Sequence, residues 1–222
     1  GRAYAIAFSS VQMMKNLKLW KKIGETAHPI LNIKVSHGTI ERGPASGTLQ
    51  FNNADIEESP MAQMLEDRFL RQCLNIEIKK NALIDLIEQR TVDEINDFNK
   101  QKQLILDNSS KLQASLIVAS DGIDSPSAKA FGLKKTGWEY KQRGLVCAVE
   151  HEHSSDNTAY QYFLPEGPLA ILPLKNNTAS IVWTENAQNA SIIAEMNDAE
   201  YLSVLRARFG DFLGQLKLTG KR

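Results

Sequence analysis

The sequence predicts an α/β fold of the mixed α+β kind, in which helices and strands of the first 135 residues precede a mostly antiparallel sheet covered by helices. Two observations lead to this prediction. Apolar residues recur at helical spacing in residues 11–20 and again in residues 61–80. After Gly132, apolar segments alternate with tight turns about every 10 to 15 residues, which is typical of antiparallel strands.

The N-terminal region begins with a helical pattern. Ser9 and Ser10 are residues that favour helix N-caps, and Gly24 is expected to end the helix that follows them. His28-Pro29 then favours an extended chain, because proline disfavours the helical conformation of the residue before it. We expect strands at residues 30–36 and 48–51, with a loop that contains glycines at residues 38–47 between them.

The middle of the chain predicts a second helix and several short strands. Ser59-Pro60 fits an N-cap followed by proline at the first helical position, so we expect a helix over residues 61–80. Residues 115–119 form a continuous apolar run between turn residues, the pattern of a strand that is buried on both faces. Further strands are expected at residues 83–87, 91–98 and 103–106.

The C-terminal part predicts the antiparallel sheet. Its strands are expected at residues 144–151, 159–164, 170–174 and 179–184. A helix is expected to follow over residues 198–212, because Leu202, Leu205 and Phe209 share one face at helical spacing.

Composition and charge exclude several classes of protein. Among the 222 residues, basic and acidic side chains both number 26, and a formal net charge of zero argues against a nucleic-acid-binding protein. No apolar run approaches the roughly 20 residues of a membrane-spanning helix, and the N-terminus lacks the apolar region of a signal peptide. We expect a cytoplasmic protein, and the composition leaves a loose membrane contact through a local patch open. Cys73 and Cys147 lack CxxC spacing and are expected to be reduced and buried.

The segment around Asp121-Gly122 has the features of a nucleotide-binding turn. A predicted buried strand leads into it, so the Asp121 carboxylate is expected at a sheet edge, where it can accept hydrogen bonds from hydroxyl groups. Gly122 allows the backbone to pass close to a ligand. Ser125-Pro126 opens a predicted helix whose N-terminus favours a phosphate. Taken alone, Asp-Gly after a strand is usually an ordinary turn.

The same segment resembles the Asp-Gly motif of the FAD-dependent aromatic hydroxylases. Asp121, Gly122 and Ser125 match that motif, and the resemblance implies that they contact FAD and the reduced nicotinamide cofactor. Ala128 stands where the family has arginine, with Lys129 one position away, and Ser120 stands where it has alanine.

Other segments narrow the resemblance to the hydroxylases of ubiquinone biosynthesis. They are residues 2–7 with 17–20, 28–36, 64–70, 138–142, 160–174 and 180–184, of which 160–174 is the most specific. The resemblance implies that Arg2, Asp67 and Arg68 contribute to the FAD site. Two alternatives stay open: Arg2 is a solvated terminal side chain, and Glu66 to Arg68 are an ordinary charged helix face.

This resemblance implies an activity and its cofactors. The intact protein is expected to bind FAD, to be reduced by NADPH or NADH, and to hydroxylate a polyprenylated phenol with O2. A ubiquinone-biosynthesis complex and the membrane surface are the implied partners. No catalytic side chain stands out, which fits a reaction whose oxygen transfer is carried by the flavin.

Two further flavin segments of the family, Gly-x-Gly-x-x-Gly and Gly-Asp-Ala-Ala-His, have no match in the sequence. We therefore expect the chain to be an internal piece that binds FAD poorly and is inactive alone. Residues 1–30 and 60–135 are expected to form part of a Rossmann-like FAD-binding domain. Residues 31–59 and 136–222 are expected to form the substrate-binding domain.

Two other functions are compatible with the sequence. One is a non-enzymatic binding or assembly domain with the same sheet, and the other is a flavin hydroxylase that acts on a soluble aromatic acid. A metal site is not expected, because His151 and His153 have no third ligand at suitable spacing, and both histidines are expected to be exposed to solvent.

Overall fold

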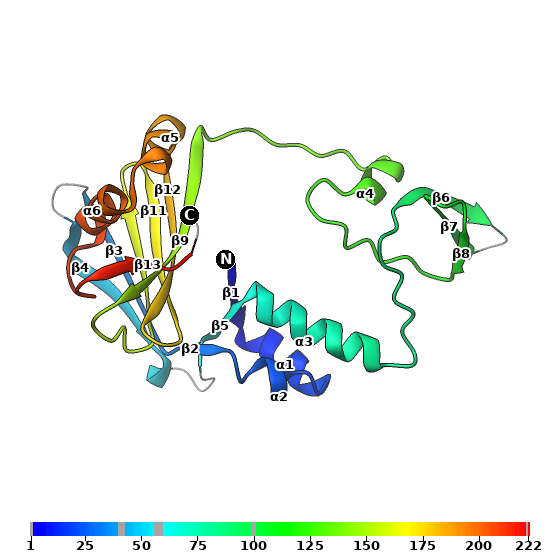
Figure 1. The fold of residues 1–222 in the computed structure, drawn as a ribbon, viewed down its shortest axis with the longest axis horizontal. Helices are drawn as coiled ribbons and strands as arrows, with labels where there is room; N and C mark the ends of the chain where they lie inside the picture. The colour runs from blue at the N-terminus through cyan, green and yellow to red at the C-terminus, as the bar shows by residue number, and fades with distance from the viewer. Residues whose placement is uncertain (1, 40–42, 56–59, 99–100, 221) are drawn as a thin grey trace. The chain divides into compact units, whose positions relative to one another are not determined.

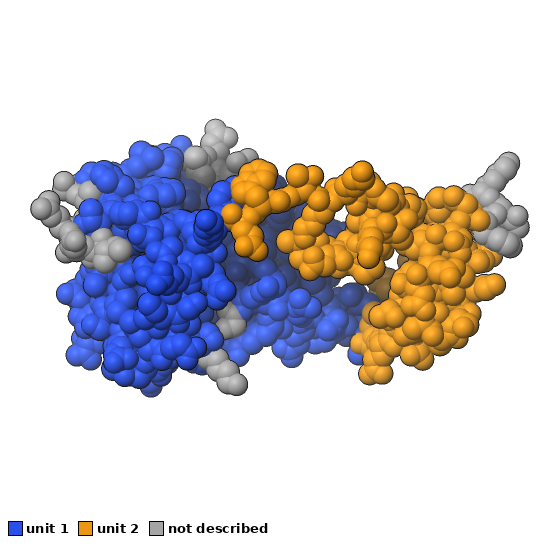
Figure 2. All heavy atoms as spheres, turned by 90° about the horizontal axis from the view of Figure 1, so that it is seen from above, with its two compact units in different colours: residues 1–80, 140–222 blue, residues 81–139 orange. Residues whose placement is uncertain are grey.

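The computed structural model describes residues 2–39, 43–55, 60–98, 101–220 and 222. The chain divides into two compact units, residues 1–80 with 140–222 and residues 81–139 (Figure 2). Within the described residues the strands form three sheets, two in the first unit and one in the second. The mixed fold with a mostly antiparallel sheet is confirmed.

The smaller sheet of the first unit carries the N-terminal helices. Its antiparallel strands, in order, are β1 (Ala3–Ala7), β5 (Ala62–Glu66) and β2 (His28–Ile30). The helices that belong to it are α1 (Phe8–Asn16), α2 (Trp20–Ile23) and α3 (Asp67–Lys80) (Figure 1). Ile23, Ala27 and Leu65 form its buried cluster, against which partly buried side chains of α1, α2 and α3 pack.

Two boundaries in this region differ from the prediction. Residues 62–66 form a strand, because Leu65 packs against the helices while Met64 packs against the other sheet of the unit, so both faces are covered. The helix therefore begins at Asp67, and Ser59 lies outside the described residues. Similarly, α1 begins at Phe8 after the unpredicted strand β1, so Ser9 and Ser10 lie inside the helix.

The large sheet is the centre of the first unit. Its order is β13-β9-β12-β11-β10-β3-β4, and neighbours are antiparallel except for the parallel pair β10 and β3. The strands are β3 (Asn32–Thr39), β4 (Gly43–Asn52), β9 (Gln142–His151), β10 (Thr158–Leu164), β11 (Gly167–Leu174), β12 (Thr178–Asn186) and β13 (Leu216–Leu218). The four predicted C-terminal strands are confirmed. The loop predicted at residues 38–47 is largely strand, because β3 and β4 extend into it.

Two helices cover one face of the large sheet (Figure 1). They are α5 (Ala187–Glu195), which was not predicted, and α6 (Asp198–Phe209), which was. Side chains from α5 and α6 join alternate residues of the central strands in one buried cluster, and Trp183, Tyr201 and Phe209 are its largest members. A capping box of Asn197 and Glu200 satisfies backbone groups where α6 begins.

The opposite face of the large sheet is covered only in part by described residues. At one end Ala159 packs with Ile30 and Met64 of the small sheet. Farther along the strands, the pairing register aligns one residue from each of six neighbouring strands in a row on this face: Val146, Val182, Ala170, Gln161, Val35 and Leu49. Leu49 is 60% exposed and Phe163, on the same face, is 55% exposed. This surface, with Val146 and Val182, is called the open face below.

The second unit contains a small antiparallel sheet and one short helix. The strands, in order, are β6 (Val92–Phe98), β7 (Gln101–Leu106) and β8 (Lys111–Ala114), and the helix is α4 (Pro126–Ala130). The strands predicted at residues 83–87 and 115–119 are not formed. Leu83 is 94% and Leu116 75% exposed. An apolar run becomes a strand only when a neighbouring strand pairs with it, and no described strand pairs with either segment.

Cys147 is buried as predicted, whereas Cys73 is only half-buried, so the prediction of burial is wrong for Cys73; both thiols are free. The helices that the structure describes are all too short or too polar to cross a bilayer.

Candidate functional site

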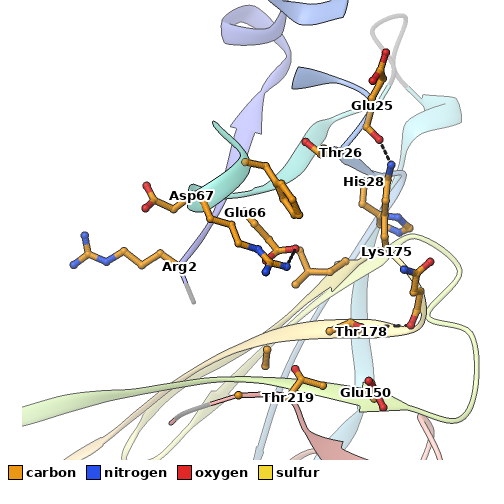
Figure 3. Close-up of a pocket in the computed structure, with 16 residues that line it drawn as sticks. Arg2, Glu25, Thr26, His28, Glu66, Asp67, Glu150, Lys175, Thr178 and Thr219 are labelled. Carbon is orange, nitrogen blue, oxygen red and sulfur yellow. Dashed lines mark hydrogen bonds and ion pairs between the residues drawn. The ribbon is translucent and has the colours of Figure 1, made fainter. Parts of the chain in front are cut away.

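A cavity of the first unit lies where the small sheet meets the end of the large sheet. Its volume is about 720 Å³, within the range of pockets that hold small molecules and cofactors. Figure 3 shows Glu25, Thr26 and His28 on one side, Arg2 and Asp67 on another, and Glu150, Thr178 and Thr219 below them. The cavity brings together three predicted cofactor residues, Arg2, Asp67 and Arg68.

The start of α3 is fixed by contacts of Asp67. The Tyr4 hydroxyl donates to Oδ1 of Asp67 over 2.7 Å, and Arg71 Nε donates to Oδ2 over 2.8 Å. The Tyr4 hydrogen bond and then the Arg71 guanidinium lower the pKa of Asp67 below its ordinary value. The backbone N–H of Asp67 also donates to the carbonyl of Arg2, which ties β1 to the first residue of the helix. Asp67 therefore stays ionised and acts first as a structural anchor.

The two predicted arginines differ in whether they form an ion pair with a described residue. Arg68 pairs with Glu66 over 2.9 Å and stacks over the ring of Phe69 at 4.5 Å. Arg2 is exposed and makes no ion pair with any described residue. Arg2 is thus the cation of this wall that can bind an added anionic or electron-rich group without breaking an existing pair.

The opposite wall holds a histidine and a lysine. Lys175, in the turn between β11 and β12, donates to the backbone carbonyl of Glu25. Burial, and then the charge of Lys175, lower the pKa of His28, while a hydrogen bond with Asn157 opposes that change. At neutral pH the His28 ring is therefore neutral, and it can donate or accept a hydrogen bond in the cavity.

Sequence reasoning missed His28, Lys175 and Glu25 as site residues. Residues 28–36 were part of the family resemblance, but no role was assigned to His28, and Lys175 belongs to an ordinary two-strand turn. They meet because of pairing between distant strands, so the local sequence alone does not show that they share a cavity.

Asp121, Gly122 and Ser125 lie in the second unit, at the start of α4. Ser125 Oγ donates to Oδ1 of Asp121 over 2.5 Å, and the Ser127 N–H donates to Oδ2 over 2.9 Å. These two hydrogen bonds, that of Ser125 first, lower the pKa of Asp121 to about 2. Ser125 also caps the helix by accepting from the Ala128 N–H over 2.9 Å.

This arrangement confirms the predicted helix start and corrects the predicted setting of Asp121. The expected strand before it is not formed, so Asp121 does not lie at a sheet edge. Its oxygens are instead occupied by the local cap. Gly122 has a φ of +88° with open space around its Cβ position, so a glycine suits this position for its backbone conformation.

The prediction that both histidines are exposed is wrong for His151. Its ring is buried and Nδ1 lies 2.7 Å from the carbonyl oxygen of His153, because alternate residues of β9 face the helices α5 and α6. His153 is exposed. Among the described residues, no three histidine, cysteine, aspartate or glutamate side chains are grouped to hold a metal ion.

Comparison with known proteins places this geometry in a family context. No family model matches the chain. The ubiquinone hydroxylase UbiL of Rhodospirillum rubrum is 30% identical over 223 residues, which cover 100% of this chain and 50% of that protein. The 3-demethoxyubiquinol 3-hydroxylase of Escherichia coli is 25% identical over 214 residues, covering 96% of this chain and 53% of the relative. The chain thus spans about half the length of these two relatives.

Among solved structures, PqsL from Pseudomonas aeruginosa, a probable FAD-dependent monooxygenase, superposes with a TM-score of 0.75 at 12% identity. The match covers 99% of this chain and 63% of PqsL, and at this identity it establishes the fold alone. Along 96% or more of its length this chain is similar in sequence to two hydroxylases of ubiquinone biosynthesis, and its fold is that of PqsL.

Proposed function

We propose that the protein to which this chain belongs is an FAD-dependent monooxygenase that hydroxylates a polyprenylated phenol in ubiquinone biosynthesis. The observation that carries the proposal is the similarity to two ubiquinone-biosynthesis hydroxylases over 96% or more of the chain. The predicted division into an FAD-binding part and a substrate-binding part belongs to this proposal.

The first-unit cavity suits part of a flavin. Its volume is sufficient, and Arg2 provides a cation that is not engaged in an ion pair with any described residue. We assign Arg2 to binding the cofactor, and Asp67 to holding the start of α3 through Tyr4 and Arg71. Arg68, paired with Glu66, has a supporting role at the rim. When bound, FAD would supply the oxygen-transfer chemistry after reduction by NADPH or NADH.

In the second unit, Asp121, Gly122 and Ser125 are proposed to contact FAD and the nicotinamide cofactor. Asp121 is ionised at neutral pH and can accept a hydroxyl hydrogen bond if its local cap rearranges. Lys129 is exposed on α4 and would provide the positive charge that the family has at the position of Ala128.

The open face supports an apolar substrate. Leu49, Phe163, Val146 and Val182 expose apolar surface on one side of the large sheet. An extended apolar surface of this kind suits a prenylated ring, whose transfer from water is favourable in proportion to the area buried. The role of these side chains is to bind and orient the ring and to exclude water.

Expression of the complete protein in a strain that lacks its own ubiquinone hydroxylase tests the activity. We expect a flavin-containing protein and restored hydroxylated quinone, measured by mass spectrometry, which also gives the ring position. Arg2→Ala should lower flavin content severalfold, whereas Arg90→Ala, in the second unit, should leave it unchanged. A complete protein that binds no flavin and restores no quinone would refute the proposal.

A second variant tests the assignment of the open face. Phe163→Ala should raise the KM for the prenylated phenol severalfold without changing flavin content, while Leu83→Ala, an exposed apolar residue of the second unit, should change neither. Equal KM values for Phe163→Ala and the unsubstituted protein would exclude this face as the substrate surface.

The proposal includes partners. A substrate with a prenyl tail resides in the membrane, so the protein must meet the bilayer surface or a complex that presents the substrate. We propose peripheral contact with the inner membrane as the route of access.

A further inference from the structure

The three N-terminal helices carry a cluster of basic side chains. Lys18, Lys21, Lys22 and Lys80 line a pocket of about 190 Å³ between α2 and the last turn of α3. Among the described residues that line this pocket, Glu77 has the only carboxylate, so four positive charges face one negative charge. This local excess contrasts with the formal net charge of zero for the whole chain.

Part of this positive charge is not neutralised within the molecule. Glu77 pairs with Lys22 over 2.8 Å and lies 3.5 Å from Lys80. Lys18 and Lys21 make no ion pair with any described carboxylate, and both side chains are exposed. Two ammonium groups are therefore available to an external anion.

Lys18 has an unusual backbone conformation. Its φ is +60°, in the left-handed region that favours glycine over residues with a Cβ. The chain keeps a lysine at this turn after α1 although a glycine would adopt it without strain. Seven other described non-glycine residues also have a positive φ, so this conformation defines the turn and is not by itself evidence for a function.

Exposed apolar side chains adjoin the lysines. Leu17, immediately before Lys18, is 60% exposed, and Met13 is 55% exposed one helical turn earlier, so the two share a face. Lysines beside exposed apolar side chains match the surface of an anionic bilayer, where headgroups attract the charges and acyl chains receive the apolar groups.

We propose that the lysine pocket, with Leu17 and Met13, is the surface through which this chain contacts an anionic membrane. The inference rests on the membrane contact proposed above and deepens it by naming the surface and its lipid class. Lys18 and Lys21 would bind lipid phosphates directly, while Leu17 enters the interface.

Vesicle co-sedimentation of the 222-residue chain tests the proposal without flavin or substrate. We expect binding to phosphatidylcholine vesicles that contain phosphatidylglycerol, little binding to pure phosphatidylcholine, and weaker binding at high salt. Each lysine near an anionic surface contributes about fivefold in partition coefficient, so Lys18→Gln with Lys21→Gln should weaken binding roughly 25-fold. Leu17→Ser should weaken binding to the same vesicles severalfold.

Controls separate a specific surface from general charge. Lys111→Gln with Lys134→Gln changes the net charge equally in the second unit and should bind vesicles like the unsubstituted chain. Lys18→Gly should raise the melting temperature, because it relieves the left-handed strain, and yet lower vesicle binding about fivefold. That result excludes misfolding as the cause of weaker binding.

Several results would overturn the proposal. One is equal binding to neutral and to anionic vesicles. Another is that the Lys111→Gln and Lys134→Gln control loses as much vesicle binding as the Lys18→Gln and Lys21→Gln variant. A third is binding to polyglutamate without binding to vesicles, which would indicate an acidic protein partner. Because no flavin is involved, vesicle binding by a protein without hydroxylase activity would contradict only the proposed function. Hydroxylation by a protein that does not bind anionic vesicles would contradict only this inference.

Discussion

Replacement of Glu185 by alanine tests the buried ion pair that joins α6 to the large sheet. Glu185 is 1% exposed, and its Oε1 accepts from Trp183 Nε1 over 2.9 Å and from Arg208 Nε over 2.8 Å. The Arg208 guanidinium also lies over the Trp183 ring, 4.4 Å from its centroid. Alanine would leave a buried guanidinium without its carboxylate, and removal of one partner of such a pair costs about 3 to 5 kcal/mol.

That loss is large compared with the roughly 5 to 15 kcal/mol that stabilises a whole domain. In urea unfolding followed by circular dichroism, it should lower the midpoint by roughly 2 M. Glu185→Gln keeps an acceptor for the indole N–H and should cost less, about 1 to 3 kcal/mol. Glu185→Leu combined with Arg208→Met removes both charges and should restore stability to within about 1 kcal/mol of the unsubstituted chain.

The double variant is therefore the decisive measurement. If Glu185→Leu with Arg208→Met is as unstable as the sum of its single substitutions, the two charges are not coupled and the reasoning fails. A loss below about 1 kcal/mol for Glu185→Ala would show that water reaches the pair in solution.

Three further predictions concern single sites. Gly167 has a φ of +147°, and a Cβ there would lie 2.8 Å from a side chain of β12, so Gly167→Ala should cost roughly 2 to 3 kcal/mol in thermal or urea unfolding. Ser125→Ala removes the first cause of the low pKa of Asp121, so an NMR titration should find that pKa raised from about 2 towards 3.8. Because the pKa of Asp121 is lower in the folded protein than in the unfolded chain, this carboxylate stabilises the fold above pH 3.8, and that contribution is lost as the pH falls towards 2. If Ser125→Ala leaves the pKa of Asp121 unchanged, the assignment of Ser125 as the first cause is refuted. Lys175→Met should raise the lowered pKa of His28 without restoring it to 6.5, since burial remains the main cause. The fold disfavours protonation of His28, so the stability of the protein should fall as the pH drops below 6.5, and it should fall less in Lys175→Met. NMR titration of both proteins measures the difference in the pKa of His28.

The C-terminal sheet could be predicted from the sequence because its signal is local. Strands such as Ala170 to Leu174 alternate between a face buried under α5 and α6 and a face that is not, and tight turns join neighbours in the chain. The predicted helix over residues 198–212 also depends on local spacing and ends at Phe209.

The errors concern segments whose structure depends on distant partners. Residues 62–66 fit a helical pattern, yet they form the central strand of the small sheet because β1 and β2 pair on either side. Residues 115–119 have the composition of a buried strand, but no described strand pairs with them, and all of them except the half-buried Ile117 are exposed. Composition reports which surface a segment can bury, whereas pairing determines whether it does.

The same distinction applies to the candidate site. Arg2, Asp67 and Arg68 were identified by resemblance, and the pairing of Ala3 with Glu66 explains why they line one cavity. His28 and Lys175 were assigned no role from the sequence, and they reach that cavity from positions far apart in the chain. Site residues that lie together in one short segment can therefore be inferred from the sequence. Site residues that come from several strands can be identified only once the fold is known. Arg2 and Arg68 illustrate the consequence: both were identified by resemblance, and only the fold shows that Arg68 pairs with Glu66 while Arg2 makes no ion pair with any described residue.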